Sequence, residues 1–323
     1  MNINNLIPQK PITADGGFKQ TTNTILMIEP VAFGFNIQTA VNNYFQQQTD
    51  FTDAEIQSNA LSEFKNMVTI LQSKGLNVLV VKDTLEPNTP DSIFPNNWIS
   101  FHIGGQAVLY PMFAENRRQE RREDILQLIN DQGTLINNVD DFTFWEKQNL
   151  FLEGTGSMVL DRVNKIAYAA LSERTHKSLF LQFCKVFEYE PVYFVANQIV
   201  ENKRFPVYHT NVMLSICDEY AVICLDSIEN LVERKVVIHS LEKTDKEIIA
   251  ISEQQMHNFA ANVLQVETKE GKRFLVMSQT AFDSLNEHQI KQLKSYNELI
   301  VIPIPTIEKV GGGSVRCMLA EIF

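Results

Sequence analysis

The sequence lacks several patterns that would place the chain in other classes of protein. Its longest apolar runs, such as Ile166 to Leu171, are as long as a strand, whereas a membrane-spanning helix needs about 20 residues. Met1 to Gly17 is polar, without the basic and then apolar order of a secretory signal, so we expect a cytoplasmic protein. A net charge of −11 argues against nucleic acid as a partner, because that partner requires a basic face.

Cysteine is scarce, and its positions form no metal pattern. No two of Cys184, Cys217, Cys224 and Cys317 have the C-x2-C spacing of a zinc site. No H-E-x-x-H or similar histidine spacing occurs either. We therefore expect no metal. Free cysteines are commonly buried, and this interpretation suits all of them except Cys317.

What the chain does contain is a repeated unit. Each copy has a tight turn, a strand of apolar residues, a helix and often a further strand. The turns recur at intervals of about 50 to 60 residues, at Gly104-Gly105, Asn164-Lys165, Asp218-Glu219 and Glu270-Gly271, and Thr24 to Val81 has the same content. Repeats of this length predict a closed or stacked α/β array with a central channel. We expect one domain covering residues 1–323, in which residues 1–20 form a loose arm. A doubly wound α/β sheet is the alternative.

Several helices are expected within these units. Thr52 or Asp53 can cap a helix at its start and Gly75 can end it. The other helices are expected to begin near Asn116, Ser172 and Ser227, and across Thr280 to Tyr296.

Two residues are candidates for nucleophile and base. Cys317 follows three glycines, which let the chain pass close to a ligand, and a thiolate is a strong nucleophile near neutral pH. The alternative is a small buried residue after a flexible loop. His209 stands at the start of a strand pattern, where it is either a general acid and base or a structural residue.

Polar residues at the heads of other strands are further candidates. Glu153 lies between apolar residues and glycines in FLEGTG, so it either faces solvent or has a partner. Asp91, Asn96 and Asn97 cluster in PDSIFPNNW, which is otherwise an ordinary polar turn.

Arginines early in two predicted helices gain nothing from the helix dipole. Arg117 lies in NRRQE and Arg174 in LSERT. Each is either a solvated surface residue or a ligand for a carboxylate, which guanidinium binds in a bidentate fork.

Taken in order, these segments resemble the guanidino-group-modifying superfamily, which includes arginine deiminases, dimethylarginine dimethylaminohydrolases, amidinotransferases and succinylarginine dihydrolases. The resemblance runs from about Ile25 to the C-terminus, through PDSIFPNNW, NRRQE, FLEG, LSERT, YHT and GGGSVRC. It implies the pentein fold, a five-bladed pseudo-symmetric α/β propeller with the site in its channel.

The resemblance also implies a role for each matching residue. Cys317 becomes the nucleophile, His209 the general acid and base, and Glu153 their acidic partner. Substrate binding is assigned to Asp91, Asn96, Asn97, Arg117, Arg174 and Asn211, with the two arginines on the α-carboxylate. No cofactor is required, and the partner is a small-molecule substrate.

Two departures from the family pattern bear on the substrate. Asn97 stands where deiminases and dimethylaminohydrolases place a carboxylate, and Asn211 where deiminases have His-x-Asp. An amide is neutral and both donates and accepts, so it suits a ureido group better than a guanidinium. The pattern is similar to citrulline-utilising hydrolases, which share the FGFN element at Phe33 to Asn36. The leading prediction is therefore hydrolysis of citrulline to ornithine, carbon dioxide and ammonia.

Other functions stay open at this point. Succinylarginine dihydrolases also place an amide nearby, so arginine remains a candidate substrate, as do deiminase and dimethylaminohydrolase chemistry. Amidinotransferases continue after the cysteine with a second cysteine and an acidic residue, whereas Met318-Leu319-Ala320 follows here. A binding protein without turnover and association into a homo-oligomer are also open.

Overall fold

The computed structural model describes residues 19–323. Within that range the strands form five three-stranded sheets and one two-stranded hairpin. In each three-stranded sheet, the middle strand is antiparallel to one neighbour and parallel to the other. The alternative of a single doubly wound sheet is therefore wrong, and a repeated α/β arrangement is correct.

The first sheet joins segments from both ends of the described chain. Its order is β17-β1-β2, and Thr24 of β1 lies opposite Ile322 of β17. The strands are β1 (Thr24–Glu29), β2 (Asn77–Lys82) and β17 (Ala320–Ile322). The next two sheets contain β3 (Ile99–His102), β4 (Gln106–Leu109), β5 (Asn138–Asp141), β6 (Val159–Asp161), β7 (Ile166–Ala170) and β8 (Glu190–Phe194). The last two contain β11 (Leu214–Ile216), β12 (Tyr220–Ile223), β13 (Glu247–Ala250), β14 (Leu264–Glu267), β15 (Arg273–Ser278) and β16 (Glu298–Ile302). The hairpin consists of β9 (Asn197–Val200) and β10 (Lys203–Pro206).

The four turns predicted from the sequence are confirmed. Each joins the antiparallel pair of a sheet: β3 to β4, β6 to β7, β11 to β12, and β14 to β15. Gly105 shows why the first of them uses glycine. Its φ is +75°, and a Cβ atom there would stand 2.3 Å from the carbonyl oxygen of Leu135.

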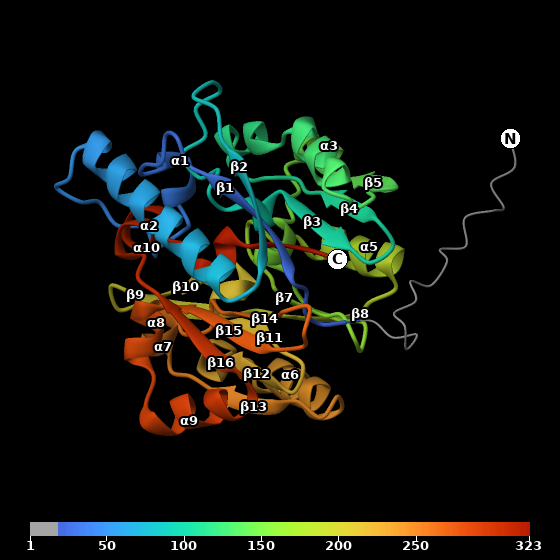
Figure 1. Cartoon of the computed structure of the whole chain (residues 1–323). Helices are drawn as coiled ribbons and strands as arrows, with labels where there is room; N and C mark the ends of the chain where they lie inside the picture. Colours follow the sequence, from blue (N-terminus) through green and yellow to red (C-terminus); the bar gives the residue numbers. More distant parts are fainter. Residues whose placement is uncertain (1–18) are drawn as a thin grey trace, which may run out of the picture.

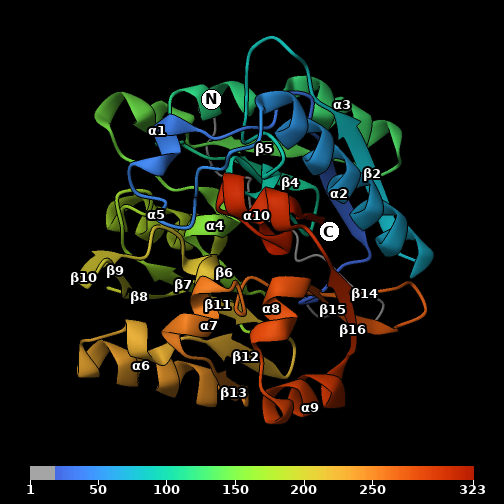
Figure 2. The same ribbon diagram turned by 90° about the vertical axis from the view of Figure 1, so that its left-hand side faces the viewer.

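Helices connect the parallel strands and lie toward the outside of the molecule. Figure 2 shows α2, α3, α5, α6 and α9 at the periphery, with α10 nearer the middle. The α-helices are α1 (Ile37–Ala40), α2 (Asp53–Ser73), α3 (Glu123–Asp131), α4 (Gly154–Ser157), α5 (Lys177–Phe187), α6 (Leu231–Glu242), α7 (Glu253–His257), α8 (Gln279–Ser284), α9 (Glu287–Tyr296) and α10 (Pro305–Gly311). The cap of α2 is as predicted, because Thr52 and Glu55 form a capping box and Gly75 follows the helix with φ +86°.

Two other helix boundaries differ from the prediction, and at one of them a side chain competes with the helix. Near Asn116 the chain forms a short 3-10 helix, η2 (Asn116–Glu120), before α3. The Ser172 hydroxyl donates to the carbonyl of Tyr208 and accepts from the backbone N–H of Arg174, which makes a turn, so α5 begins only at Lys177. Arg174 therefore lies in a turn and not in a helix.

The later helices also depart from the prediction. A 3-10 helix, η5 (Leu225–Ser227), comes first near Ser227, and α6 begins at Leu231 after its cap Asn230. The predicted stretch from Thr280 is divided into α8 and α9, because Asn286 caps a new helix.

The core consists of apolar residues packed between each sheet and its helix, as Phe64, Met67 and Leu71 of α2 pack with Ile25 and Met27 of β1. Gln20 is also buried and donates to the carbonyls of Leu160 and Ile216. The rest of the predicted arm, residues 1–18, lies outside the described residues. In the described part of the chain, no helix is long and apolar enough to cross a membrane.

Four short helices stand at equivalent places in four sheets. Each comes just before the strand that runs antiparallel to the middle strand: η1 (Pro95–Asn97) before β3, α4 before β6, η4 (Thr210–Val212) before β11, and η6 (Val315–Met318) before β17. The pairs η1–α4, α4–η4 and η1–η6 are in contact. Segments far apart in the sequence (Figure 1) are thereby brought together with their polar residues.

Candidate active site

Six of the residues predicted from the sequence line one small pocket. They are Asp91, Asn97, Arg117, Arg174, His209 and Cys317, together with Thr39, Asn43, Phe94, Tyr208, Gly311 and Gly313. The other three predicted residues lie one contact behind this lining: Glu153 touches His209, Asn96 touches Asn97, and Asn211 touches Cys317.

His209 and Glu153 form a buried pair. The Nε2 atom of His209 lies 2.7 Å from Oε2 of Glu153, whose Oε1 accepts the backbone N–H of Phe113 at 2.9 Å. The same Oε2 lies 3.5 Å from Nη1 of Arg174. This contact assigns the proton of a neutral imidazole to Nε2, which leaves Nδ1 to accept a proton in a reaction.

The charges of this pair follow from its surroundings. Burial would raise the pKa of Glu153, but Arg174 and His209 outweigh burial and hold that pKa at about 2. Burial lowers the pKa of His209 to about 4, and Glu153 opposes this shift only in part. At neutral pH, Glu153 is therefore ionised and His209 is neutral.

Cys317 is presented by a loop that only glycine can build. A Cβ atom at Gly311 or Gly313 would stand 2.8 or 2.9 Å from the ring of Phe94. Gly312 has φ +63° and would place a Cβ atom 2.6 Å from Gln46. The sulfur is almost fully buried and lies near two amide nitrogens, Nδ2 of Asn211 at 3.5 Å and Nδ2 of Asn262 at 3.3 Å.

Arg117 is buried and held on several sides. Its Nε and Nη2 donate to the two carboxylate oxygens of Glu120 at 2.8 and 2.9 Å, and its Nη1 donates to Oδ1 of Asn97 at 2.7 Å. Nη2 also reaches the carbonyl of Phe94 at 3.2 Å. This bidentate pairing leaves few N–H groups of Arg117 for a substrate in this conformation.

Arg174 contacts the segment that contains α1. Its Nε donates to Oδ1 of Asn42 at 2.8 Å, and its Nη2 donates to the carbonyl of Thr39 at 2.8 Å. Asn43 of the same segment donates to the carbonyl of Gly312 at 3.3 Å. The segment thus joins Arg174 to the loop that presents Cys317.

Asp91 and Asn97 are oriented by other amides. Oδ2 of Asp91 accepts from Nδ2 of Asn36 at 2.7 Å, whereas Oδ1 of Asp91 is buried and has no partner within residues 19–323. Nδ2 of Asn97 donates to Oδ1 of Asn96, which in turn donates through Nδ2 to the hydroxyl of Thr155. Asn96 therefore fixes the amide of Asn97 and does not line the pocket.

Sequence reasoning missed Thr39, Asn42, Asn43, Tyr208 and Asn262. Asn262 carried a usable signal, because it is a polar residue in an apolar stretch just before a strand, as Glu153 is. Tyr208 stands beside His209 in the YHT motif, whereas Thr39, Asn42 and Asn43 lie in a segment whose folded position over the pocket only the tertiary structure reveals.

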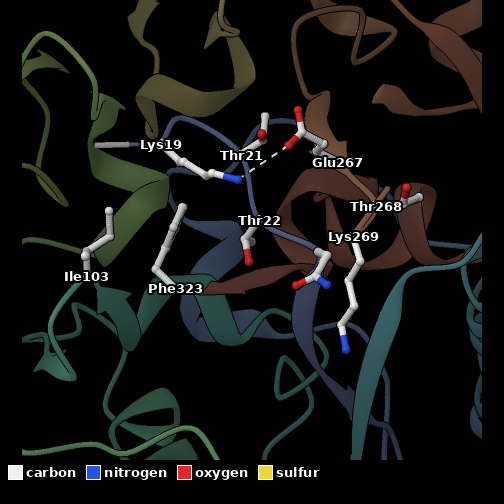
Figure 3. Close-up of a pocket in the computed structure, with 9 residues that line it drawn as sticks. Lys19, Thr21, Thr22, Ile103, Glu267, Thr268, Lys269 and Phe323 are labelled. Atoms are coloured by element: carbon white, nitrogen blue, oxygen red, sulfur yellow. Dashed lines mark ion pairs between the residues drawn. The ribbon is translucent and has the colours of Figure 1, made fainter. Parts of the chain in front are cut away.

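Other features of the described residues lie apart from this site. A surface pocket lined by Lys19, Thr22, Glu267, Lys269 and Phe323 contains none of the predicted site residues, and Lys19 lies 3.8 Å from Glu267 (Figure 3). Among residues 19–323 there is no cluster of three or more His, Cys, Asp or Glu that could hold a metal ion.

Solved structures share this fold at low sequence identity. ArgZ, an arginine dihydrolase from the ornithine–ammonia cycle in cyanobacteria, is 18% identical with a TM-score of 0.70 over 93% of this chain. The chain covers 40% of that full-length protein and 97% of its N-terminal domain bound to substrate. An adduct of dimethylarginine dimethylaminohydrolase with S-methyl-L-thiocitrulline is 14% identical with a TM-score of 0.61, over 94% of this chain and 100% of that one. No curated protein matches the sequence.

The match of a family model, together with the shared fold, identifies the chain as an enzyme of the guanidino-group-modifying superfamily with the pentein fold, a hydrolase that acts on carbon–nitrogen bonds other than peptide bonds. The family model described as N,N dimethylarginine dimethylhydrolase, eukaryotic, matches residues 29–323. The chain belongs to that family.

Proposed function

We propose that this enzyme hydrolyses the ureido group of citrulline and releases ornithine, carbon dioxide and ammonia. The observation that carries the choice of substrate is that neutral amides, Asn97 and Asn211, stand beside Arg117 and Cys317. A ureido group is also neutral, so its burial beside amides leaves no unpaired charge.

Two unsatisfied oxygens support a head group rich in N–H donors. Oδ1 of Asp91 and Oδ1 of Asn211 are both buried without a hydrogen-bond partner among the described residues. Buried acceptors of this kind normally have a donor, and the ureido group offers N–H groups on both of its nitrogens. We infer that these two oxygens accept them.

The reaction begins at the sulfur of Cys317. The thiol proton passes to Nδ1 of His209, and the thiolate adds to the ureido carbon. The protonated His209 then gives its proton to the departing amine, the carbon–nitrogen bond breaks, and ornithine leaves a carbamoyl group on the sulfur. Water, deprotonated by His209, releases carbamate, which breaks down to carbon dioxide and ammonia. Glu153 stabilises the imidazolium in both steps.

The arginines provide for the α-carboxylate. Arg174 is the better placed of the two, because its Nε and Nη2 bind only neutral groups, Asn42 and the carbonyl of Thr39, which a carboxylate can replace, while its Nη1 lies 3.5 Å from Glu153. Arg117 keeps Glu120 and Asn97 in place and is proposed to contribute through its remaining N–H groups.

Arginine is the second candidate substrate, and one observation favours it. Three buried carboxylates, Asp91, Glu120 and Glu153, surround two buried guanidiniums, Arg117 and Arg174. Burial raises the pKa of Glu120 to about 8, so Glu120 carries little of this negative charge at neutral pH, but a cationic head group could pair with Oδ1 of Asp91, which is buried without a partner among the described residues. AgrE has a structure in complex with L-arginine, at 16% identity and a TM-score of 0.70.

Side-by-side assays of ornithine and citrulline formation separate the two substrates. The wild type is expected to favour citrulline over arginine in kcat/KM, and Asn97→Asp should move this ratio toward arginine by tenfold or more, about 1.4 kcal/mol. Asn77→Asp makes the same charge change at an exposed position of strand β2 and should leave the ratio unchanged. Efficient conversion of arginine to citrulline by a wild type that ignores citrulline would overturn the proposal.

We further propose that the five sheets form a five-bladed α/β propeller in one catalytic domain. The pairing of β1 with β17 and the contacts of β17 with β3 and of β6 with β11 support this arrangement. No cofactor enters the proposed steps, because water and the side chains named supply every proton and nucleophile.

A further inference from the structure

Asn262 occupies the position that carries active-site residues in other sheets. Asn97, Asn211 and Cys317 each stand just before the strand antiparallel to the middle strand of a sheet. Asn262 stands just before β14, which has the same place beside β15. It is fully buried, at 0% exposure. The fold therefore delivers this side chain to the same region as the predicted site residues.

The amide of Asn262 is fixed between the nucleophile and two backbone groups. Its Nδ2 lies 3.3 Å from Sγ of Cys317 and donates to the carbonyl of Asn211 at 3.1 Å. Its Oδ1 accepts the backbone N–H of Arg316 at 3.1 Å and, while the sulfur is protonated, the thiol of Cys317 at 3.7 Å. If the amide were reversed, its oxygen would face the carbonyl oxygen of Asn211, and its N–H groups would face the backbone N–H of Arg316. The observed orientation, with the N–H side toward the sulfur, is therefore the one that satisfies both backbone groups.

A buried thiolate requires such donors. Cys317 is only 3% exposed, so little water can stabilise a negative charge on its sulfur. A cationic substrate could supply compensating charge, whereas a neutral ureido group cannot. The N–H groups of Asn262 and Asn211 are the donors directed at the sulfur in this structure.

We propose that Asn262 is a positioning residue that, with Asn211, orients the sulfur of Cys317 and stabilises its thiolate by N–H donation. This inference rests on the proposed function in that Cys317 is the nucleophile. Asn262 gains and loses no proton: the thiol proton goes to His209, and the amide changes only from a neighbour of the thiol to a donor to the thiolate.

Charged and titratable groups around the sulfur bear on any pH profile. Those that line the pocket with Cys317 are Asp91, Arg117, Arg174, Tyr208 and His209, and Glu153 lies behind His209. The hydrogen bonds of the Asn262 side chain to described residues go to Asn211, Arg316 and Cys317 and to none of these groups. A substitution at Asn262 therefore changes one interaction of the sulfur and leaves these groups in place.

The test is the rate of alkylation of Cys317 by iodoacetamide, measured by peptide mass from about pH 6 to about pH 9, across the range in which thiols titrate. Asn262→Asp replaces a donor with a carboxylate of the same shape, so its rate at pH 7 should fall at least tenfold and its profile should move to higher pH. Asn262→Ser should show a smaller change in the same direction. Asn297→Asp is the matched control, because Asn297 is also buried and bonds to Tyr220 and Gln265 instead.

Turnover provides the second measurement. The Asn262 variants should lose kcat while KM stays within about twofold, because the substrate does not bind to this amide. An alkylation profile of folded Asn262→Asp that overlaps the wild type would overturn the inference. Since alkylation needs no substrate, a wild type that alkylates as expected but forms no ornithine from citrulline would overturn the proposed function alone.

Discussion

The substitution Glu153→Gln isolates the charge on which the site depends. The side chain keeps its shape but can no longer balance Arg174 or accept from His209 as an anion. The pKa of Glu153 is held at about 2, below its ordinary value of 4.5. A difference of this size corresponds to an interaction on the order of 3 kcal/mol in favour of the ionised form. We expect Glu153→Gln to lose a comparable part of the free energy of unfolding at pH 7.

Urea unfolding at several pH values measures this loss. Because the pKa of Glu153 is lowered in the folded state, its contribution is complete above about pH 4.5 and disappears as the pH falls toward about 2. The gap between wild type and variant should therefore narrow over this window. Turnover should also fall at least 100-fold, since His209 loses the carboxylate that stabilises its charged form.

Glu308→Gln is the matched control. Glu308 is also buried, but burial raises its pKa, and it accepts from the hydroxyls of Ser314 and Thr280. The same substitution there should change the free energy of unfolding by less than about 1 kcal/mol. Equal and small losses in Glu153→Gln and Glu308→Gln would refute the reasoning.

Three further outcomes are expected. Gly156→Ala should lower kcat/KM on the order of 100-fold, because a Cβ atom there would lie 2.5 Å from Nδ2 of Asn97 and 2.8 Å from Nδ1 of His209. Gly34→Ala is the control and should leave kcat/KM unchanged, because a Cβ atom at Gly34 would have nothing within 4 Å. Burial holds the pKa of His209 at about 4 in the folded protein, so as the pH falls below about 6.5 the imidazole is protonated first in the unfolded chain. The free energy of unfolding should therefore decrease on the order of 3 kcal/mol between about pH 6.5 and about pH 4. The decrease should be smaller in His209→Asn. An unchanged slope in that variant would contradict the assignment. Arg174→Ala should mainly raise KM, and a loss confined to kcat would place Arg174 at the chemistry instead.

Local sequence patterns predicted much of the architecture. The turns at Gly104, Asn164, Asp218 and Glu270 were visible because each separates strand-length apolar runs, and all four join antiparallel strands. The boundaries of helices were less predictable. At Ser172 the side chain bonds to the backbone and makes a turn, and at Asn230 the side chain caps a helix that begins later than expected; periodicity reveals neither.

The candidate site was predictable where a motif marks the head of a strand. Asn97, His209 and Cys317 come together for this reason, through short helices that contact one another. The partners that fix them were not predictable. Glu120 pairs with Arg117 from three residues away within η2, a local contact. Asn42 binds Arg174 across 132 residues of sequence, so that contact depends on tertiary packing.

Covalent attachment of the substrate carbon to Cys317 is the central claim, and mass analysis of the protein during turnover tests it most directly. Wild type mixed with citrulline and quenched early should carry a carbamoyl group on the peptide that contains Cys317, and ornithine should appear with it. Cys317→Ser should show neither adduct nor turnover while it unfolds like the wild type. Ornithine formation at the wild-type rate by Cys317→Ser would contradict the account.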